Sequence, residues 1–191
     1  MRSNIANVLD LELTCYEDGV FPEGERAEVI EFGITMVDLP TRTILKTLSI
    51  PVIPTMSTVS PFCARLTGWT PAKLNRSGVP YAEACRRILE KYGGRNRLLV
   101  VDSDDETEIV RVQCALSGNG IAPVEYPFGT SQLNVSTLFE LLTGEKSNVG
   151  LDKMLELLGL QFEGRRHRAG DDSKNIARVL LKLLEKGSFK L

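Results

Sequence analysis

The sequence predicts an α/β protein in which a mixed sheet is covered by helices. Three strand-like segments follow one another within residues 5–51, a short apolar strand interrupts the helical segments after them, and the rest of the periodic sequence is helical. The hydrophobic fraction of 42% and the charged fraction of 25% are ordinary for a globular protein. A length of 191 residues fits one domain, so we expect residues 1–191 to form a single domain.

The first three segments have the signals of strands. Residues 5–13 alternate apolar and polar side chains from residue 9 onward, and residues 28–38 and 42–51 are two further strand-like runs. Pro40 and Thr41 supply a turn between the second and third runs. Three consecutive strands of this kind predict an antiparallel meander at the edge of a sheet.

After the third strand, the period of the apolar residues changes from two to that of a helix. Glycines such as Gly68 and Gly93 end several of these segments, as is typical of helix termini. The run RLLVV at residues 97–101 interrupts them as a short buried strand. The predicted helices are residues 57–66, 81–92, 105–116, the second part of 130–142, 151–158 and 172–186.

Charge and cysteine content restrict the class of partner. Lys and Arg number 23 and Asp and Glu number 25, so any contact with nucleic acid must be local or must use metal ions as the positive charge. The four cysteines have no CxxC spacing, which argues against structural zinc and favours a reducing compartment, the cytoplasm. We expect no signal peptide, and no apolar run approaches the roughly 20 residues of a membrane helix.

Two carboxylates share one face of the first strand. Because side chains alternate along a strand, Leu9, Leu11 and Leu13 point one way and Asp10 and Glu12 point the other. Such a pair is costly between apolar residues unless it is hydrated or bound to a cation. The pattern alone fits either a solvated strand face or a cation site.

Helical periodicity distinguishes three aspartates in the middle of the chain. Asp105 falls in line with Ile109 and Val112, so we predict that its side chain faces the packed interior. Asp102 or Asp104 is then expected to cap the helix.

The last helix repeats this arrangement. Asp172 falls in line with Ile176 and Val179 and is expected to face inward, while Asp171 belongs to the cap. The single histidine, His167, lies five residues before Asp172 in a basic loop. It is either a surface residue or a base, because an unperturbed imidazole titrates near pH 6.5 and can take a proton from water.

Together these residues predict a metal-dependent site. Hard oxygen ligands without cysteine or a second histidine select Mg²⁺ or Mn²⁺. Two such ions roughly 3.5–4 Å apart can hold a phosphate and position a water molecule. The predicted site comprises Asp10, Glu12, Asp105, Asp172 and His167.

This order of residues resembles that of the DEDDh 3′→5′ exonucleases, and of the branch that includes histone-mRNA 3′ exonucleases and exonucleases regulating RNA interference. The segments that carry the resemblance are LDLELTC (9–15), EVIEFGI (28–34), PFCARLTGWT (61–70), QCALS (113–117) and HRAGDDSKNIARV (167–179). The resemblance covers residues 5–185. It implies a ribonuclease-H-like fold, with a mixed five-stranded sheet flanked by helices, and release of nucleoside 5′-monophosphates from the 3′ end of single-stranded nucleic acid, with RNA favoured.

The resemblance also implies individual roles. The four acids are carried over as ligands of two divalent ions and His167 as the general base. The middle motif departs from the family pattern, in which an aromatic residue and a glycine commonly precede the Asp. Here the run is Val101-Asp102-Ser103-Asp104, which leaves Asp102 and Asp104 as alternatives to Asp105.

Substrate contacts are expected from residues around these acids. The loop at residues 66–70 resembles the one that borders the 3′-terminal nucleotide in this family. Trp69 either stacks on a base or packs under its own loop. The expected contact residues are Leu11, Leu13, Thr14, Leu66, Thr67, Trp69 and Arg168, with Arg165, Arg166 and Lys174 as further cations. Two other functions remain open, a DNA proofreading exonuclease and a non-catalytic nucleic-acid-binding or protein-binding module.

Overall fold

The sheet of the computed structural model, which describes residues 4–118, 122–145 and 149–186, has five strands in the order β3-β2-β1-β4-β5. Strands β1 (Ile5–Leu13), β2 (Val29–Asp38) and β3 (Thr43–Pro51) form an antiparallel meander. Strand β4 (Leu98–Val101) pairs parallel with β1, and β5 (Gln132–Asn134) pairs parallel with β4. The expected mixed five-stranded sheet, with the meander at one edge, is confirmed.

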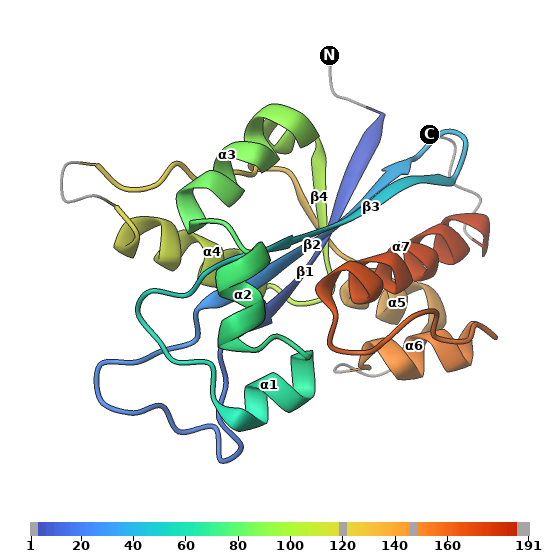
Figure 1. Cartoon of the computed structure of the whole chain (residues 1–191). Coiled ribbons are helices and arrows are strands. Elements are labelled where there is room, and N and C mark those ends of the chain that lie inside the picture. The colour runs from blue at the N-terminus through green and yellow to red at the C-terminus, as the bar shows by residue number, and fades with distance from the viewer. Residues whose placement is uncertain (1–3, 119–121, 146–148, 187–191) are drawn as a thin grey trace.

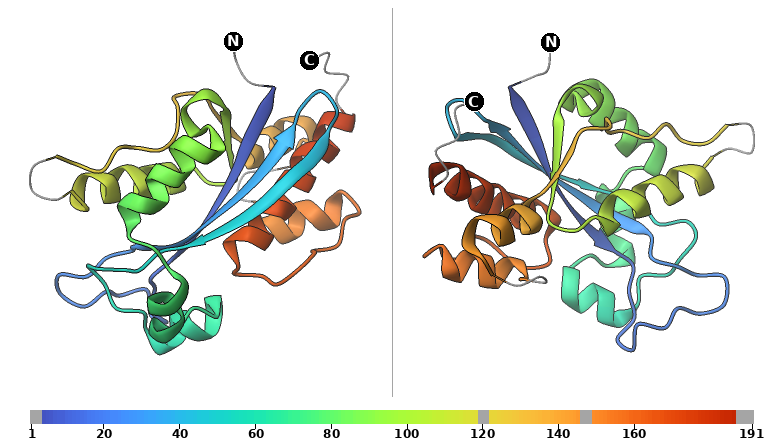
Figure 2. Two further views of the ribbon diagram at one scale, coloured as in Figure 1. Left: turned by 45° about the horizontal axis from the view of Figure 1, so that its top comes forward. Right: turned by 180° about the vertical axis from the view of Figure 1, so that it is seen from behind.

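Helices cover both faces of the sheet (Figures 1 and 2). Helices α3 (Tyr81–Tyr92) and α4 (Asp105–Leu116) lie over one face. Helices α5 (Val135–Thr143), α6 (Leu151–Leu157) and α7 (Ala169–Lys186) lie over the other. The short helices α1 (Pro61–Thr67) and α2 (Pro71–Ser77) lie beyond the far end of β1 (Figure 1). No helix among the described residues is both long and apolar enough to cross a bilayer.

Strand β1 separates the two halves of the core. Ala6 and Val8 pack with the residues of α5, α6 and α7, whereas Leu9 packs with those of α3 and α4. Because side chains alternate along the strand, Asp10 continues the face of Val8. Asp10 and Glu12 therefore lie on the face of β1 that α7 covers, at the end of the strand where the apolar core stops.

Some helix boundaries differ from the expected ones. Helix α1 begins at Pro61 rather than at residue 57, because the Ser60 hydroxyl caps it by accepting from the Cys63 N–H and proline suits the first turn. Helix α2 was not expected, and it begins in the same way after the cap of Thr70. Helix α7 begins at Ala169, three residues before the expected start.

Glycine at position 33 allows the start of α7 to lie directly against β2. A Cβ atom at Gly33 would overlap the backbone carbonyl group of Ala169. Further along the same face, the hydroxyl of Thr35 bonds to the hydroxyl of Ser173 at 3.0 Å. This close approach brings Asp172 to the end of β1.

Candidate active site

The first acidic group joins the end of β1 to the first turn of α7. Carboxylate oxygens of Asp10, Glu12 and Asp172 all lie within 4.8 Å of one another. Glu12 is 8% exposed, and the other two are half-buried. The expected common face of Asp10 and Glu12 and the inward direction of Asp172 are therefore confirmed.

A second acidic group shares Asp10 with the first. Carboxylate oxygens of Asp10, Asp102 and Glu106 also lie within 4.8 Å of one another. The parallel register pairs Val8 with Val100, so two residues further on Asp102 lies beside Asp10 as β4 ends. Glu106 reaches the same point from the first turn of α4.

The expectation that Asp105 faces the interior is wrong. Its side chain is exposed, and the buried face of α4 instead contains Glu106, Val110, Gln113 and Cys114. Gln113 is only 2% exposed, and its Oε1 accepts the Val29 N–H at 2.8 Å. The apolar pattern misled the assignment by one position, because three polar residues, Glu106, Thr107 and Gln113, are buried on this helix.

The expected cap of α4 is also different. The Ser103 hydroxyl accepts the Asp105 N–H at 3.3 Å, whereas the carboxylate of Asp104, at the N-cap position, makes no capping hydrogen bond. Asp104 instead accepts from Gln132 Nε2 at 3.1 Å. The Asp102 carboxylate instead lies within 4.8 Å of the carboxylates of Asp10 and Glu106.

Burial and mutual repulsion raise the pKa values of these carboxyl groups. Burial, and next Asp172, raise the pKa of Glu12 to about 8. Burial likewise raises the pKa of Asp172 to about 6, although the Arg168 N–H and the nearby His167 lower it. The pKa of Asp10 is raised well above its ordinary value by burial and by Glu106.

Glu106 carries an uncompensated oxygen. Burial and Asp102 raise its pKa well above the ordinary value, although the Leu11 N–H lowers it. Its Oε2 atom is buried and has no hydrogen-bond partner within the described residues. A buried carboxylate oxygen without a donor is costly, and a cation removes that cost. The acidic cluster therefore fits divalent metal ions, which prefer carboxylate oxygens.

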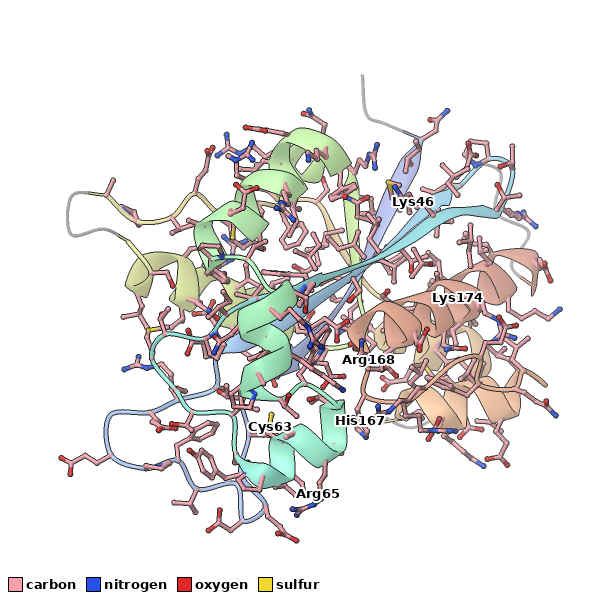
Figure 3. The ribbon with its side chains drawn as sticks, viewed as in Figure 1. Lys46, Cys63, Arg65, His167, Arg168 and Lys174 are labelled. Carbon is pink, nitrogen blue, oxygen red and sulfur yellow. The ribbon has the colours of Figure 1, made fainter. Side chains whose placement is uncertain are left out.

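His167 lies at the rim of this cluster. It is exposed and adopts a left-handed backbone conformation with φ of 60°. The loop before it is held by the carboxylate of Asp171, which accepts the Arg165 N–H at 2.9 Å, and Asp172 accepts the Arg168 N–H at 2.9 Å. Figure 3 shows His167 and Arg168 together on the side of α1 and α2 that faces α7.

Trp69 packs under its own loop, which was one of its two expected placements. It is 7% exposed, and its Nε1 donates to Glu31 Oε2 at 2.6 Å. The guanidinium carbon of Arg168 lies 4.3 Å from the centroid of its ring. Arg168 thus covers the ring face, and its own position depends on the packing of Trp69.

The other expected contact residues differ in exposure. Leu11, Leu13 and Leu66 are half-buried, whereas Thr67 and Thr14 are buried. The Thr14 hydroxyl donates to the Arg26 carbonyl group and accepts the Glu28 N–H, each at 3.0 Å. The Thr14 hydroxyl therefore makes its hydrogen bonds within the fold.

Two of the expected cations are paired with acids. Arg166 lies 2.9 Å from Asp152, and Lys174 lies 2.8 Å from Glu163. Arg165 instead reaches across to the end of α1, where its guanidinium donates to the Leu66 carbonyl group at 3.5 Å. Of the expected cations, Arg165 and Arg168 therefore lie nearest to the 66–70 loop.

A known family accounts for this arrangement. The family described as "RNase_T: Exonuclease" matches residues 8–180. The chain belongs to this exonuclease family. The solved nuclease domain of 3′hExo, "a DEDDh family member, bound to rAMP", has a TM-score of 0.83 and 27% identity, over 96% of this chain and 93% of that one. The resemblance inferred from the sequence is thus confirmed, as is the ribonuclease-H-like fold.

Two relatives are longer than this chain, so the similarity covers only part of each. The human "3'-5' exoribonuclease 1" is 32% identical over 94% of this chain and 52% of its own length. The Drosophila melanogaster "3'-5' exonuclease Snipper" is 26% identical over 95% of this chain and 69% of its own. The chain therefore spans about half the length of the human relative.

Two residues at the site were not firmly assigned by sequence reasoning. Asp102 was considered as a cap of the helix and as an alternative ligand to Asp105, and Glu106 was not singled out. A signal for Asp102 was present, because it follows the apolar strand that pairs with β1. Glu106 had no such signal, since its burial depends on how α4 packs.

Proposed function

We propose that this chain is a metal-dependent 3′→5′ exonuclease that hydrolyses single-stranded RNA or short oligonucleotides to nucleoside 5′-monophosphates. The observation that carries the proposal is a pair of three-residue acidic clusters. Both clusters include Asp10, and they lie beside His167. Asp10, Glu12 and Asp172 would hold one ion, and Asp10, Asp102 and Glu106 the other. Mg²⁺ and Mn²⁺ suit these all-oxygen ligands.

The chain's own residues have distinct tasks in this reaction. Bound divalent ions supply the positive charge that the scissile phosphate and the leaving oxygen require. His167 takes a proton from the water that attacks phosphorus, and its exposure at the rim lets it pass that proton to solvent. The P–O bond to the 3′ oxygen of the preceding nucleotide breaks, and that oxygen is protonated by solvent.

We favour RNA as the substrate because the names of two similar proteins refer to RNA. One is an exoribonuclease, and a solved structure with a TM-score of 0.81 and 28% identity concerns "3'-end specific recognition of histone mRNA stem-loop by 3'-exonuclease". Arg168 over Trp69, beside the site, is the cation that we assign to the 3′-terminal nucleotide.

We further propose that residues 1–191 act as one exonuclease domain and that the protein works in the reducing cytoplasm. The family match extends from residue 8 to residue 180, and all five acids meet beside a single sheet. The four cysteines are free thiols. This agrees with a reducing compartment.

The test is release of nucleotides from matched RNA and DNA decamers that carry a 3′-terminal label. With Mn²⁺ we expect labelled nucleoside monophosphate as the first product, faster from RNA than from DNA, and no product with chelator. Asp10→Ala should abolish release while the circular dichroism spectrum is retained. Folded wild-type protein that releases no mononucleotide would favour a non-catalytic binding module, and a strong preference for DNA would favour the proofreading alternative.

A further inference from the structure

Glu31 is a buried carboxylate beside the site that the proposed reaction does not use. It is 0% exposed, and the β1–β2 register places it directly opposite Glu12. Cβ atoms of such cross-strand neighbours lie about 4.5–5.5 Å apart, and like charges there destabilise a sheet. A carboxylate in this position therefore requires strong compensation from hydrogen-bond donors.

Three different segments supply those donors. The Ser49 hydroxyl on β3 donates to Oε1 of Glu31. Trp69 Nε1, in the loop between α1 and α2, donates to Oε2 at 2.6 Å, and the backbone N–H of Ala169, at the start of α7, donates to the same oxygen at 3.3 Å. Oε2 of Glu31 thus connects the sheet to both segments that flank the acidic groups.

The two donors on Oε2 constrain the residues next to them. Ala169 directly follows Arg168, and Trp69 lies beneath the Arg168 guanidinium group, 4.3 Å from its ring centroid. Figure 3 shows Arg168 next to His167, which precedes it in the chain. Ser49 is different, because it lies on β3 and donates to the other oxygen of Glu31, Oε1.

We propose that Glu31 is a positioning residue for this reaction, an inference that rests on the proposed exonuclease function. Its hydrogen bonds to Trp69 and Ala169 hold the segment of His167 and Arg168 against the acidic groups. The bond to Ser49 helps to keep Glu31 buried but does not act on the site.

Two substitutions that each remove one donor from Glu31 separate these roles. Trp69→Phe removes the Nε1 donor and keeps an aromatic ring beneath Arg168, whereas Ser49→Ala removes the hydroxyl on β3. For release of nucleotides from the labelled RNA decamer, we expect Trp69→Phe to lower kcat by about tenfold or more, with a smaller change in KM, because misplaced groups slow the chemical step. We expect Ser49→Ala to leave kcat within about twofold, because the donors that reach the site remain in place.

Substitutions of Glu31 itself test whether an acceptor is sufficient. Glu31→Gln keeps an oxygen for Trp69 and Ala169, and the Ser49 hydroxyl can reverse its hydrogen bond. We expect this variant to retain kcat within about threefold, and Glu31→Ala to lose at least about tenfold, because only the alanine leaves both donors unsatisfied. If Glu31→Ala does not fold, the comparison of Trp69→Phe with Ser49→Ala still tests the positioning role of Glu31.

Trp69 is the only tryptophan in the chain, so its fluorescence reports the same contact without turnover. We expect Glu31→Ala to move the emission maximum to longer wavelength, as water reaches the indole, and Ser49→Ala to leave it unchanged. Equal kcat for Trp69→Phe and Ser49→Ala, with an active wild type, would overturn the inference, and so would a fully active Glu31→Ala. A folded but inactive wild type would overturn the proposed function, and the positioning role with it.

Discussion

The carboxylates of Asp10, on strand β1, and Glu106, on helix α4, approach within 4.8 Å of each other from opposite faces of the sheet. The contact is possible because β4 ends at Val101, so Glu106 in the first turn of α4 can approach Asp10 beyond the end of β4. The second acidic group therefore arises beside β1, where β4 ends and α4 begins.

We expect Glu106→Gln to weaken Mn²⁺ binding by about 10–100-fold, as loss of a group at a metal site does. The same change removes one of several repelling carboxylates, so the metal-free protein should melt at a higher temperature. Calorimetric titration with Mn²⁺ and thermal unfolding in chelator measure the two effects. Asp105→Asn is the matched control. Asp105 is the residue next to Glu106, but its carboxylate is exposed and belongs to neither acidic cluster. An Asp105→Asn protein that loses Mn²⁺ affinity, beside an unaffected Glu106→Gln, would restore Asp105 as the ligand.

The stability of the metal-free protein should fall as the pH rises from 5 to 8. The pKa of Glu12 is about 8 in the folded chain, against an ordinary value of 4.5, so across this range the unfolded chain ionises this group while the folded chain resists ionisation. Asp172, with a pKa of about 6, acts in the same direction over the lower part of the range. We expect a fall in melting temperature of roughly 5 °C or more in chelator.

Divalent ions should reverse this dependence, because they bind the ionised carboxylates. Melting curves at pH 5 and pH 8, each with chelator and with Mn²⁺, provide the measurement. Glu12→Gln cannot ionise at this position and should show a flatter profile in chelator. A profile in chelator that rises with pH, for the wild type, would contradict the assigned pKa shifts.

His167 is expected to act in turnover and not in metal binding. His167→Ala should lower kcat on the order of 10²–10⁴-fold, as loss of a general base does, while Mn²⁺ affinity is retained. His167→Gly should lose as much activity without loss of stability, because glycine adopts the φ of 60° more readily than histidine. Single-turnover kinetics and melting curves measure both. A His167→Ala protein with wild-type kcat would mean that His167 is an ordinary surface residue.

The packing of α7 on β2 predicts a large effect at Gly33. Gly33→Ala places a Cβ against the carbonyl group of Ala169, so either the helix moves or the backbone is strained. We expect a loss of about 3 kcal/mol or more in the free energy of unfolding, measured with urea. Gly150→Ala is the control, since a Cβ there meets nothing within 4 Å and its φ of −67° suits alanine. Equal stability of the two variants would show that α7 can shift at little cost.

Local pattern was sufficient for much of the fold. The alternation in β1 placed Asp10 and Glu12 on one face, and both helix spans at Tyr81–Tyr92 and Asp105–Leu116 agree with the prediction. Asp172 was also placed correctly, because the apolar stripe of α7 is wide and regular. In α3 and α7, an apolar face packs on the sheet, so the buried side follows from periodicity, whereas the buried face of α4 does not.

The sequence by itself determined the class of the sheet, the directions of Asp10, Glu12 and Asp172, and the family. Only the tertiary structure decided that Asp102 and Glu106, rather than Asp105, join Asp10, and that Trp69 lies beneath Arg168 on the carboxylate of Glu31. The reason is that periodicity defines the faces of an isolated helix, whereas the choice of buried face depends on what packs against it. On α4 that choice follows the hydrogen bond between Gln113 and Val29, which joins residues far apart in the chain.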